Sequence, residues 1–389
     1  MTITDDDAAR LVAELVKIES VTPWLIPDGS GERDVTAFMS AWLADLPVDV
    51  QLDEIAPGRI NLVARLRGSG GGPTLCLNAH ADTVGFANWR DRALTPEREG
   101  DRMIGLGAAD DKACCALSLL ALRSIVESGA TLRGDLLVAC TADEEGVSIG
   151  TEDLVERYEM DAALVLEPDG LPKLCIEHQG FGWIDVIVHG KAAHGSAPEL
   201  GIDAIVHMAE VVRRLDRLDR EVFAKNVDPM NGKTVFHTGT LQAGTDYATY
   251  PSRAVLGIEI GSQPGEHLSD RVREIEGIFA ELEGELDGFR GEVDVKLDRD
   301  PFRAEGHEAL HAAIDASSGV ELGRPLEPVG LNAWTDAALM QAAGIPTLLM
   351  GPLGGNFHAP DEWVSIPEVA ATARIVEGAV RRFCGEVSG

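Results

Sequence analysis

The feature that most constrains the fold is an alternation of short apolar runs with longer stretches of helical periodicity. A buried strand is predicted for each apolar run in the first half of the chain, at 61–66, 74–78, 135–140 and 162–166. An amphipathic helix around Leu11–Val16 precedes these runs. Helices that alternate with buried strands are typical of an α/β fold.

Polar motifs directly follow three of these predicted strands. They are His80 with Asp82, Glu144 with Glu145, and Glu167. In open α/β sheets, ligands bind beyond the carboxyl ends of the strands, where side chains that are distant in sequence converge. We therefore expect these motifs to share one site.

The pattern changes between about residues 177 and 299. It predicts a βαββαβ unit, with strands at 183–188, 234–241, 254–260 and 292–297 and helices at 202–218 and 268–286. None of the polar motifs lies in this unit, which indicates an inserted α+β domain. The α/β pattern then resumes with a helix at 307–317, a strand at 346–350 and a closing helix at 367–383. The expected division is 1–176 and 300–389 for the two parts of one domain and 177–299 for the insertion.

Composition narrows the classes of partner. The 389 residues, 45% of them hydrophobic, can bury a large core, and 65 acidic against 33 basic residues give a net charge of −32. Such a charge repels nucleic acids and anionic membranes, so a small-molecule substrate is expected. The sequence shows neither a signal peptide nor a long apolar span, which predicts a cytoplasmic protein. Six cysteines without CxxC spacing predict buried, reduced thiols and disfavour a thiolate zinc site.

The acidic and histidine motifs together supply the ligands for two divalent metal ions. Such a pair needs a bridging carboxylate, further anionic ligands and neutral imidazoles. The predicted ligands are His80, Asp110 as the bridge, Glu145, Glu167 and His358. Mixed nitrogen and oxygen ligation favours zinc, with cobalt and manganese as alternatives. Asp82 is predicted to accept a hydrogen bond from His80 and so to fix its tautomer.

Glu144 is the predicted general base. Two adjacent residues of an extended segment point in opposite directions, so Glu145 can bind metal while Glu144 faces water. Water between two cations loses a proton near neutral pH, and a carboxylate can carry that proton to a leaving amine. The segment 105–110 begins like a dinucleotide-binding loop, but Asp110 replaces its third glycine. HExxH, GxSxG and P-loop motifs do not occur in the sequence.

These motifs, in their order along the chain, resemble those of a known family. The matching segments are 20–23, 80–84, 105–112, 142–146, 167–168, 334–338, 344–346 and 358–364. They are similar to those of the acetylornithine deacetylase, succinyl-diaminopimelate desuccinylase and carboxypeptidase G group of dinuclear zinc peptidases. The resemblance implies a zinc-peptidase-like catalytic domain, with a mixed sheet flanked by helices, split around a smaller dimerisation lid domain.

The resemblance also implies how the ligands divide between the ions. One ion would be held by His80, Asp110 and Glu167, and the other by Asp110, Glu145 and His358. The peptide bond between Asp110 and Asp111 is expected to be cis.

Further roles in the lid follow from the same resemblance. His194, in the segment 190–198, would reach the active site of a partner subunit and stabilise the oxyanion, which implies a homodimer. Relatives commonly carry a carboxylate-binding arginine where this chain has Gly261, and an asparagine where it has Ala248. Glycine has no side chain that could bind a carboxylate through two hydrogen bonds, as arginine does. Either Arg253 or another cation of the lid therefore substitutes, or the substrate lacks that carboxylate.

The leading hypothesis is a metal-dependent hydrolase that cleaves the amide bond of an N-acyl amino acid or a related small N-acyl compound. The alternatives are a dipeptidase or aminopeptidase, a hydrolase of an atypical amide without the usual carboxylate, and a non-catalytic binding protein. Retention of all five predicted ligands together with Glu144 disfavours the last of these.

Overall fold

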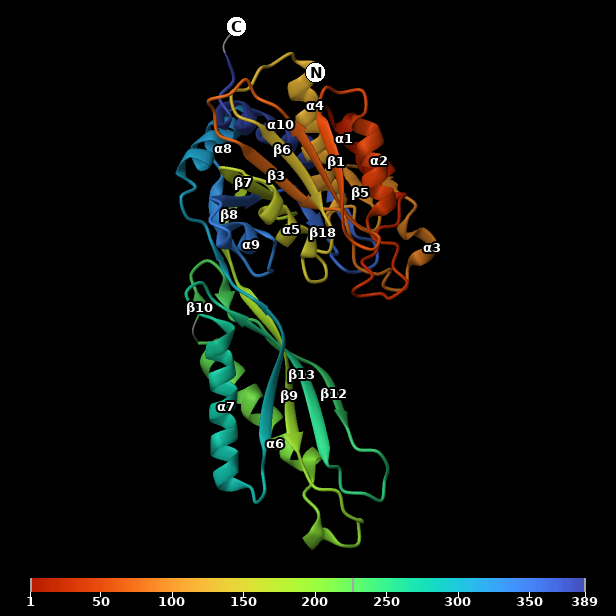
Figure 1. Cartoon of the computed structure of the whole chain (residues 1–389), viewed down its shortest axis with the longest axis vertical. Coiled ribbons are helices and arrows are strands. Elements are labelled where there is room, and N and C mark those ends of the chain that lie inside the picture. Colours follow the sequence, from red (N-terminus) through yellow and green to blue (C-terminus); the bar gives the residue numbers. More distant parts are fainter. Residues whose placement is uncertain (1, 226, 388–389) are drawn as a thin grey trace. The chain divides into compact units, whose positions relative to one another are not determined.

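The computed structural model describes residues 2–225 and 227–387 and divides into two compact units. The first unit contains the described residues up to Ile176, the segment Ala304–Pro328 and the described residues from Thr335 onward. The second contains Glu177–Arg303 and Val329–Trp334, so it extends past residue 299 and includes a short later segment. Figure 1 shows the course of the chain through both units.

The first unit is built on a mixed β-sheet. Its strands run in the order β1-β2-β6-β3-β7-β17-β8, and β3, β6, β7 and β17 are parallel to their neighbours within this group. The strands assigned to this unit are β1 (Asp49–Ala56), β2 (Arg59–Leu66), β3 (Leu75–His80), β4 (Glu97–Glu99), β5 (Arg102–Ile104), β6 (Leu136–Thr141), β7 (Ala162–Leu166), β17 (Thr347–Met350), β18 (Gly354–Gly355) and β19 (Trp363–Ser365). Each of β8 (Lys173–His178) and β16 (Glu327–Leu331) contains a point where the chain passes from one unit to the other.

Helices flank this sheet. They are α1 (Asp5–Val16), α2 (Arg33–Leu43), α3 (Arg90–Ala93), α4 (Lys112–Glu127), α5 (Ile149–Arg157), α8 (Glu308–Glu321), α9 (Ala337–Ala342) and α10 (Ile366–Phe383). Helices α1, α4, α8 and α10 pack together, while α5 and α9 contact each other and the sheet. Strands β3, β6 and β7 are buried along their whole length, which is why their sequences are continuously apolar. The predicted α/β fold with a mixed sheet between helices is confirmed.

A small second sheet brings together segments that are far apart in the sequence. Its strand order is β18-β19-β5-β4, and Trp363 of β19 pairs with Ile104 of β5. This sheet adjoins the two loops that carry the predicted ligands Asp110 and His358. Strand β5 precedes the Asp110 loop, and the His358 loop connects β18 to β19.

The second unit contains a four-stranded antiparallel sheet in the order β12-β13-β9-β14. Helices α6 and α7 lie against this sheet (Figure 1). The apolar core of this unit includes Ile184, Met208 and Phe279. The predicted order βαββαβ is observed. Its elements are β9 (Gly180–His189), α6 (Ala204–Leu218), β12 (Phe236–Ala243), β13 (Arg253–Ser262), α7 (Leu268–Glu285) and β14 (Gly291–Arg299). Shorter elements are β10 (Val227–Asp228), β11 (Gly232–Lys233), β15 (Phe302–Arg303), a 3-10 helix (Pro198–Leu200) and a π-helical turn (Asp219–Phe223).

Among residues 2–225 and 227–387, no helix is both long and apolar enough to cross a membrane. All six cysteines are buried and free of disulfide bonds, as predicted.

Candidate metal centre

The ends of three parallel strands position the first residues of the site. His80 is the last residue of β3, Glu167 follows β7 directly, and the Glu144–Glu145 pair follows β6. Because these strands are adjacent and parallel, their carboxyl ends meet at one edge of the sheet. The pair Glu144–Glu145 lies in a turn that begins after Asp143 in a left-handed conformation, and not in the extended segment that the sequence analysis assumed.

Two loops bring the remaining residues to this edge. Asp110 lies just before α4, and the Asp110–Asp111 peptide bond is cis, as the family resemblance implied. His358 lies in the loop between β18 and β19.

The Asp110 carboxylate lies between two imidazoles. Its Oδ1 is 2.9 Å from Nε2 of His80, and its Oδ2 is 3.3 Å from Nε2 of His358. Nε2 of His358 is also 3.2 Å from Oε1 of Glu145. Nε2 of His80 is 3.9 Å from Oε1 of Glu167. The structure thus gathers all five residues that the sequence predicted as ligands.

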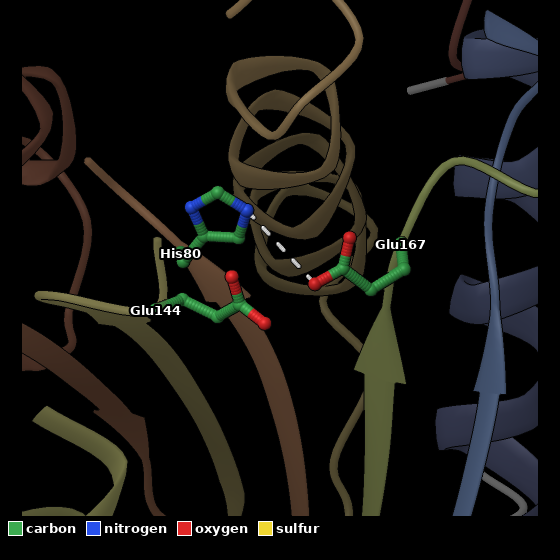
Figure 2. A group of neighbouring side chains, drawn as sticks. All are labelled: His80, Glu144 and Glu167. Carbon is green, nitrogen blue, oxygen red and sulfur yellow. Dashed lines mark ion pairs between the residues drawn. The ribbon is translucent and has the colours of Figure 1, made fainter. Parts of the chain in front are cut away.

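Glu144 belongs to the same cluster, but its carboxylate lies in a different group of ligand atoms from that of Glu145. Ligand atoms of His80, Glu144 and Glu167 lie within 4.8 Å of one another, and so do those of His80, Asp110 and Glu145. Figure 2 shows the carboxylate ends of Glu144 and Glu167 near the His80 ring, with the His80–Glu167 ion pair dashed. The two neighbouring glutamates therefore take part in different groups.

Asp82 connects His80 to the Glu144–Glu145 turn. Nδ1 of His80 is 3.1 Å from the backbone oxygen of Asp82 and 3.4 Å from its Oδ1. The two carboxylate oxygens of Asp82 accept hydrogen bonds from the backbone N–H groups of Glu144 and Glu145, at 3.1 and 3.2 Å. With Nδ1 as the donor, Nε2 of His80 keeps its lone pair for the Asp110 side of the cluster.

Burial makes charge costly for the glutamates of the cluster. It raises the pKa of Glu144 and of Glu167 well above the ordinary value, and it also raises the pKa of Glu145. For Asp110, burial acts in the same direction, but hydrogen bonds with His358 and His80 lower its pKa. Hydrogen bonds with Asp110 and Glu145 raise the pKa of His358 to about 11. Carboxylates outnumber cationic groups in this cluster. Within the described part of the chain, the ion pairs that Asp110, Glu145 and Glu167 make are with the imidazoles of His80 and His358.

This donor set fits divalent cations. Carboxylate oxygens and imidazole nitrogens are ligands of zinc and related metals, and the added positive charge would relieve the crowding of buried carboxylates.

His194 lies in the second unit, whereas the cluster belongs to the first. Its side chain is exposed, and its Nδ1 is 2.8 Å from Oγ of Ser196. The backbone of His194 forms an isolated bridge with Thr249, which ties its loop to the segment before β13.

Gly261 occupies a position in the second unit where an added side chain would force its neighbours to shift. A Cβ atom there would lie 2.8 Å from Oε1 of Gln179 and 3.2 Å from the backbone nitrogen of Val235. The buried Gln179 carboxamide donates to the backbone oxygens of Asn231 and Lys233 and accepts from the N–H of Val235. An arginine at position 261 would therefore displace Gln179 and the loop that it holds.

The sequence motifs assigned no role to Glu362, yet its carboxylate accepts three backbone N–H groups of the Asp110 loop. Its place in the matching segment 358–364 was the only signal in the sequence, and that signal did not specify a contact.

Comparison with known proteins identifies the family. A model described as peptidase family M20/M25/M40 matches residues 76–382. The chain belongs to this family. Its members are metal-dependent amide hydrolases, and so is this protein, which confirms the resemblance found in the sequence motifs.

Individual relatives agree with this assignment. Acetylornithine deacetylase from Vibrio cholerae is 28% identical over 365 residues, which cover 91% of this chain and 92% of the relative. The crystal structure of aminopeptidase PepT from Bacillus cereus has a TM-score of 0.79 at 22% identity and covers 98% of this chain and 100% of that one. A dinuclear metal binding peptidase of the M20 family from Bacillus subtilis has a TM-score of 0.71 at 15% identity, covering 97% and 98%. The two structures show that the fold is shared.

Proposed function

We propose that this protein hydrolyses the amide bond of an N-acyl amino acid or a related small N-acyl compound, using two divalent ions. The observation that carries the proposal is the Asp110 carboxylate, whose two oxygens face His80 and His358 separately. A carboxylate so placed can bridge two ions. Similarity to acetylornithine deacetylase over 91% of the chain supports the choice of substrate class.

The same geometry supports a division of ligands. His80, Asp110 and Glu167 would hold one ion, and Asp110, Glu145 and His358 the other. When bound, the ions would make water more acidic and polarise the amide carbonyl. Zinc is the proposed metal, since mixed nitrogen and oxygen ligands suit it, with cobalt and manganese as alternatives.

Glu144 is the proposed general base. It would accept a proton from the attacking water at a carboxylate oxygen and deliver that proton to the leaving nitrogen of the amide. Asp82 supports this role because it fixes the backbone of the Glu144–Glu145 turn and accepts from His80. One buried residue, Asp82, thus contacts both the predicted ligand His80 and the turn that carries the proposed base.

His194 is proposed to stabilise the oxyanion from a partner subunit, in a homodimer formed through the second unit. Its exposed side chain, on a loop tied to Thr249, is available to a partner. We also propose that the enzyme acts in the cytoplasm, where its six buried thiols would stay reduced.

Arg253 is proposed to bind the substrate carboxylate, since Gly261 cannot. It is exposed, lines a cavity of about 280 Å³ with Thr249, Ser252 and Gln242, and has no ion-pair partner among the described residues.

Replacement Arg253→Ala should raise KM for an N-acyl amino acid about tenfold or more, with kcat changed less. KM for the matching carboxamide should not change. The control is Arg217→Ala, an exposed arginine of α6. Equal effects on both substrates would contradict the role of Arg253.

A dipeptidase or aminopeptidase activity is the second candidate, because the fold is shared with aminopeptidase PepT. A single experiment separates the candidates. The purified protein is analysed for bound metal and assayed with N-acetyl, N-succinyl and N-formyl amino acids, dipeptides and simple amides, with and without chelator. The proposal expects chelator-sensitive release of the amine from an N-acyl amino acid. Cleavage of dipeptides alone would support the second candidate, and the absence of both metal and turnover would refute both.

A further inference from the structure

Glu362 links the two loops that carry Asp110 and His358. It lies four residues after His358, directly before β19, and is 1% exposed. Its side chain reaches the loop that precedes α4, although the two segments are far apart in the sequence.

Glu362 accepts hydrogen bonds from four backbone N–H groups of the Asp110 loop. Oε1 of Glu362 accepts from Ala109 at 2.9 Å and from Asp110 at 3.0 Å, and Oε2 accepts from Gly107 at 3.1 Å. The backbone oxygen of Glu362 accepts from Gly105 at 3.0 Å. Hydrogen bonds from backbone N–H groups to a carboxylate are stronger than those to a neutral acceptor, and buried N–H groups are costly to leave unpaired.

The loop that Glu362 holds is also closely packed against other residues. Gly107 has a φ of +71°, and a Cβ atom there would lie 2.6 Å from Cγ2 of Thr83 and 3.1 Å from Cδ of Lys112. The buried Lys112 donates from Nζ to the backbone oxygen of Ile18 at 2.6 Å. With this packing and the hydrogen bonds to Glu362 together, the loop has little freedom to move.

We infer that Glu362 is a positioning residue of the metal centre: it fixes the backbone of Asp110, and thereby holds the Asp110 carboxylate between His80 and His358. This inference rests on the proposed two-metal function. Among the described residues, the Glu362 carboxylate accepts hydrogen bonds from the loop and none from either imidazole, so it acts through Asp110. Because both proposed ion sites include Asp110, both should weaken when Glu362 is changed.

The test is the replacement Glu362→Gln. The amide keeps the size of the side chain, but its NH₂ group stands where the carboxylate has its second acceptor oxygen. A donor then faces a backbone N–H, and at least one of the hydrogen bonds to the loop is lost. The matched control is Asp135→Asn, because Asp135 also accepts a backbone N–H, from Gly68 at 2.7 Å, at the start of β6 and so at the end opposite to Glu144.

The readouts do not depend on activity. Zn²⁺ affinity is measured by competition with a chelator, the environment of the metal by the absorption spectrum of the Co²⁺ form, and folding by circular dichroism and thermal unfolding of the metal-free protein. Glu362→Gln should lower Zn²⁺ affinity about 10- to 100-fold and change the Co²⁺ spectrum. Asp135→Asn should leave affinity and spectrum unchanged.

A second variant covers the case in which Glu362→Gln does not fold. Glu362→Asp keeps the charge but is one methylene shorter, and we expect it to bind Zn²⁺ with intermediate affinity. Wild-type affinity and an unchanged Co²⁺ spectrum in either folded variant would overturn the inference and leave the proposed function intact. Wild-type protein that binds no metal would instead refute the proposed function, and the inference with it.

Discussion

Glu144 and Glu145 are neighbours in the sequence, yet the turn after β6 directs their carboxylates to different groups of the cluster. This separation allows one to act as a ligand and the other as a base. Glu144→Gln should therefore retain bound metal but lower kcat about a hundredfold or more, because the acceptor for the proton is removed. Metal content and steady-state rates measure the two effects. Glu156→Gln, an exposed change on α5, is the control. Turnover near the wild-type rate would rule out Glu144 as the base.

Arg59 is a second residue whose burial has a measurable consequence. Its guanidinium is 2.6 Å from Oε1 of Glu32 and 2.7 Å from Oδ1 of Asp143, and its side chain is 10% exposed. Arg59→Met would leave both carboxylates buried without their cation. The free energy of unfolding should fall by about 3–5 kcal/mol.

Denaturant unfolding of the metal-free protein measures this change. The control Arg67→Met breaks an exposed pair with Asp49 and should cost about 1 kcal/mol or less. Equal losses in the two variants would show that burial does not determine the effect. Because Asp143 directly precedes Glu144, Arg59 also supports the turn that carries the proposed base.

At the scale of elements, the parallel strands of the first unit were predicted correctly because their environment is uniform. Strands β3, β6, β7 and β17 lie at the predicted apolar runs because both of their faces are covered. The β4-β5-β18-β19 sheet was not predicted. Its strands are only two or three residues long, and their pairing joins distant segments, so no local periodicity reveals them.

The candidate site shows the same limit. Residue types and strand ends were enough to predict which side chains would gather. The contact between Glu362 and the Asp110 loop was not predictable, because a carboxylate that accepts backbone N–H groups requires no particular partner residue in the sequence. The roles of the gathered residues remain predictions.

Helix α7 of the second unit offers a prediction at this scale. Gly277 lies in the exposed middle of the helix, and a Cβ atom there would meet no other atom within 4 Å. Gly277→Ala should raise the free energy of unfolding of this unit by about 0.5–1 kcal/mol, because alanine loses less backbone entropy in a helix.

In contrast, Gly261→Ala should lower the free energy of unfolding of the same unit, since its Cβ would press on Gln179. Hydrogen exchange of amides in α7 and β13 reports both changes, and stabilisation by Gly261→Ala would contradict the packing described for Gln179.

At the scale of the whole molecule, the proposed site is complete only if a partner supplies His194. In that case neither His194→Ala nor Glu144→Ala protein should be active alone, but mixed dimers should contain one intact site. That site combines Glu144 of the first protomer with His194 of the second. Random exchange of equal amounts makes half of the dimers mixed, each with one working site of two, so activity should recover to about a quarter of the wild-type value.

Size-exclusion chromatography with light scattering establishes whether dimers form, and mass spectrometry of differently tagged protomers shows whether subunits exchange. The control is Glu144→Ala protein that is carried through the same exchange procedure alone, which should stay inactive. If exchange is complete and no activity returns, His194 does not act in a partner's site. If His194→Ala is already as active as wild type, the oxyanion must be stabilised by other groups, and the exposed loop of His194 has a different role.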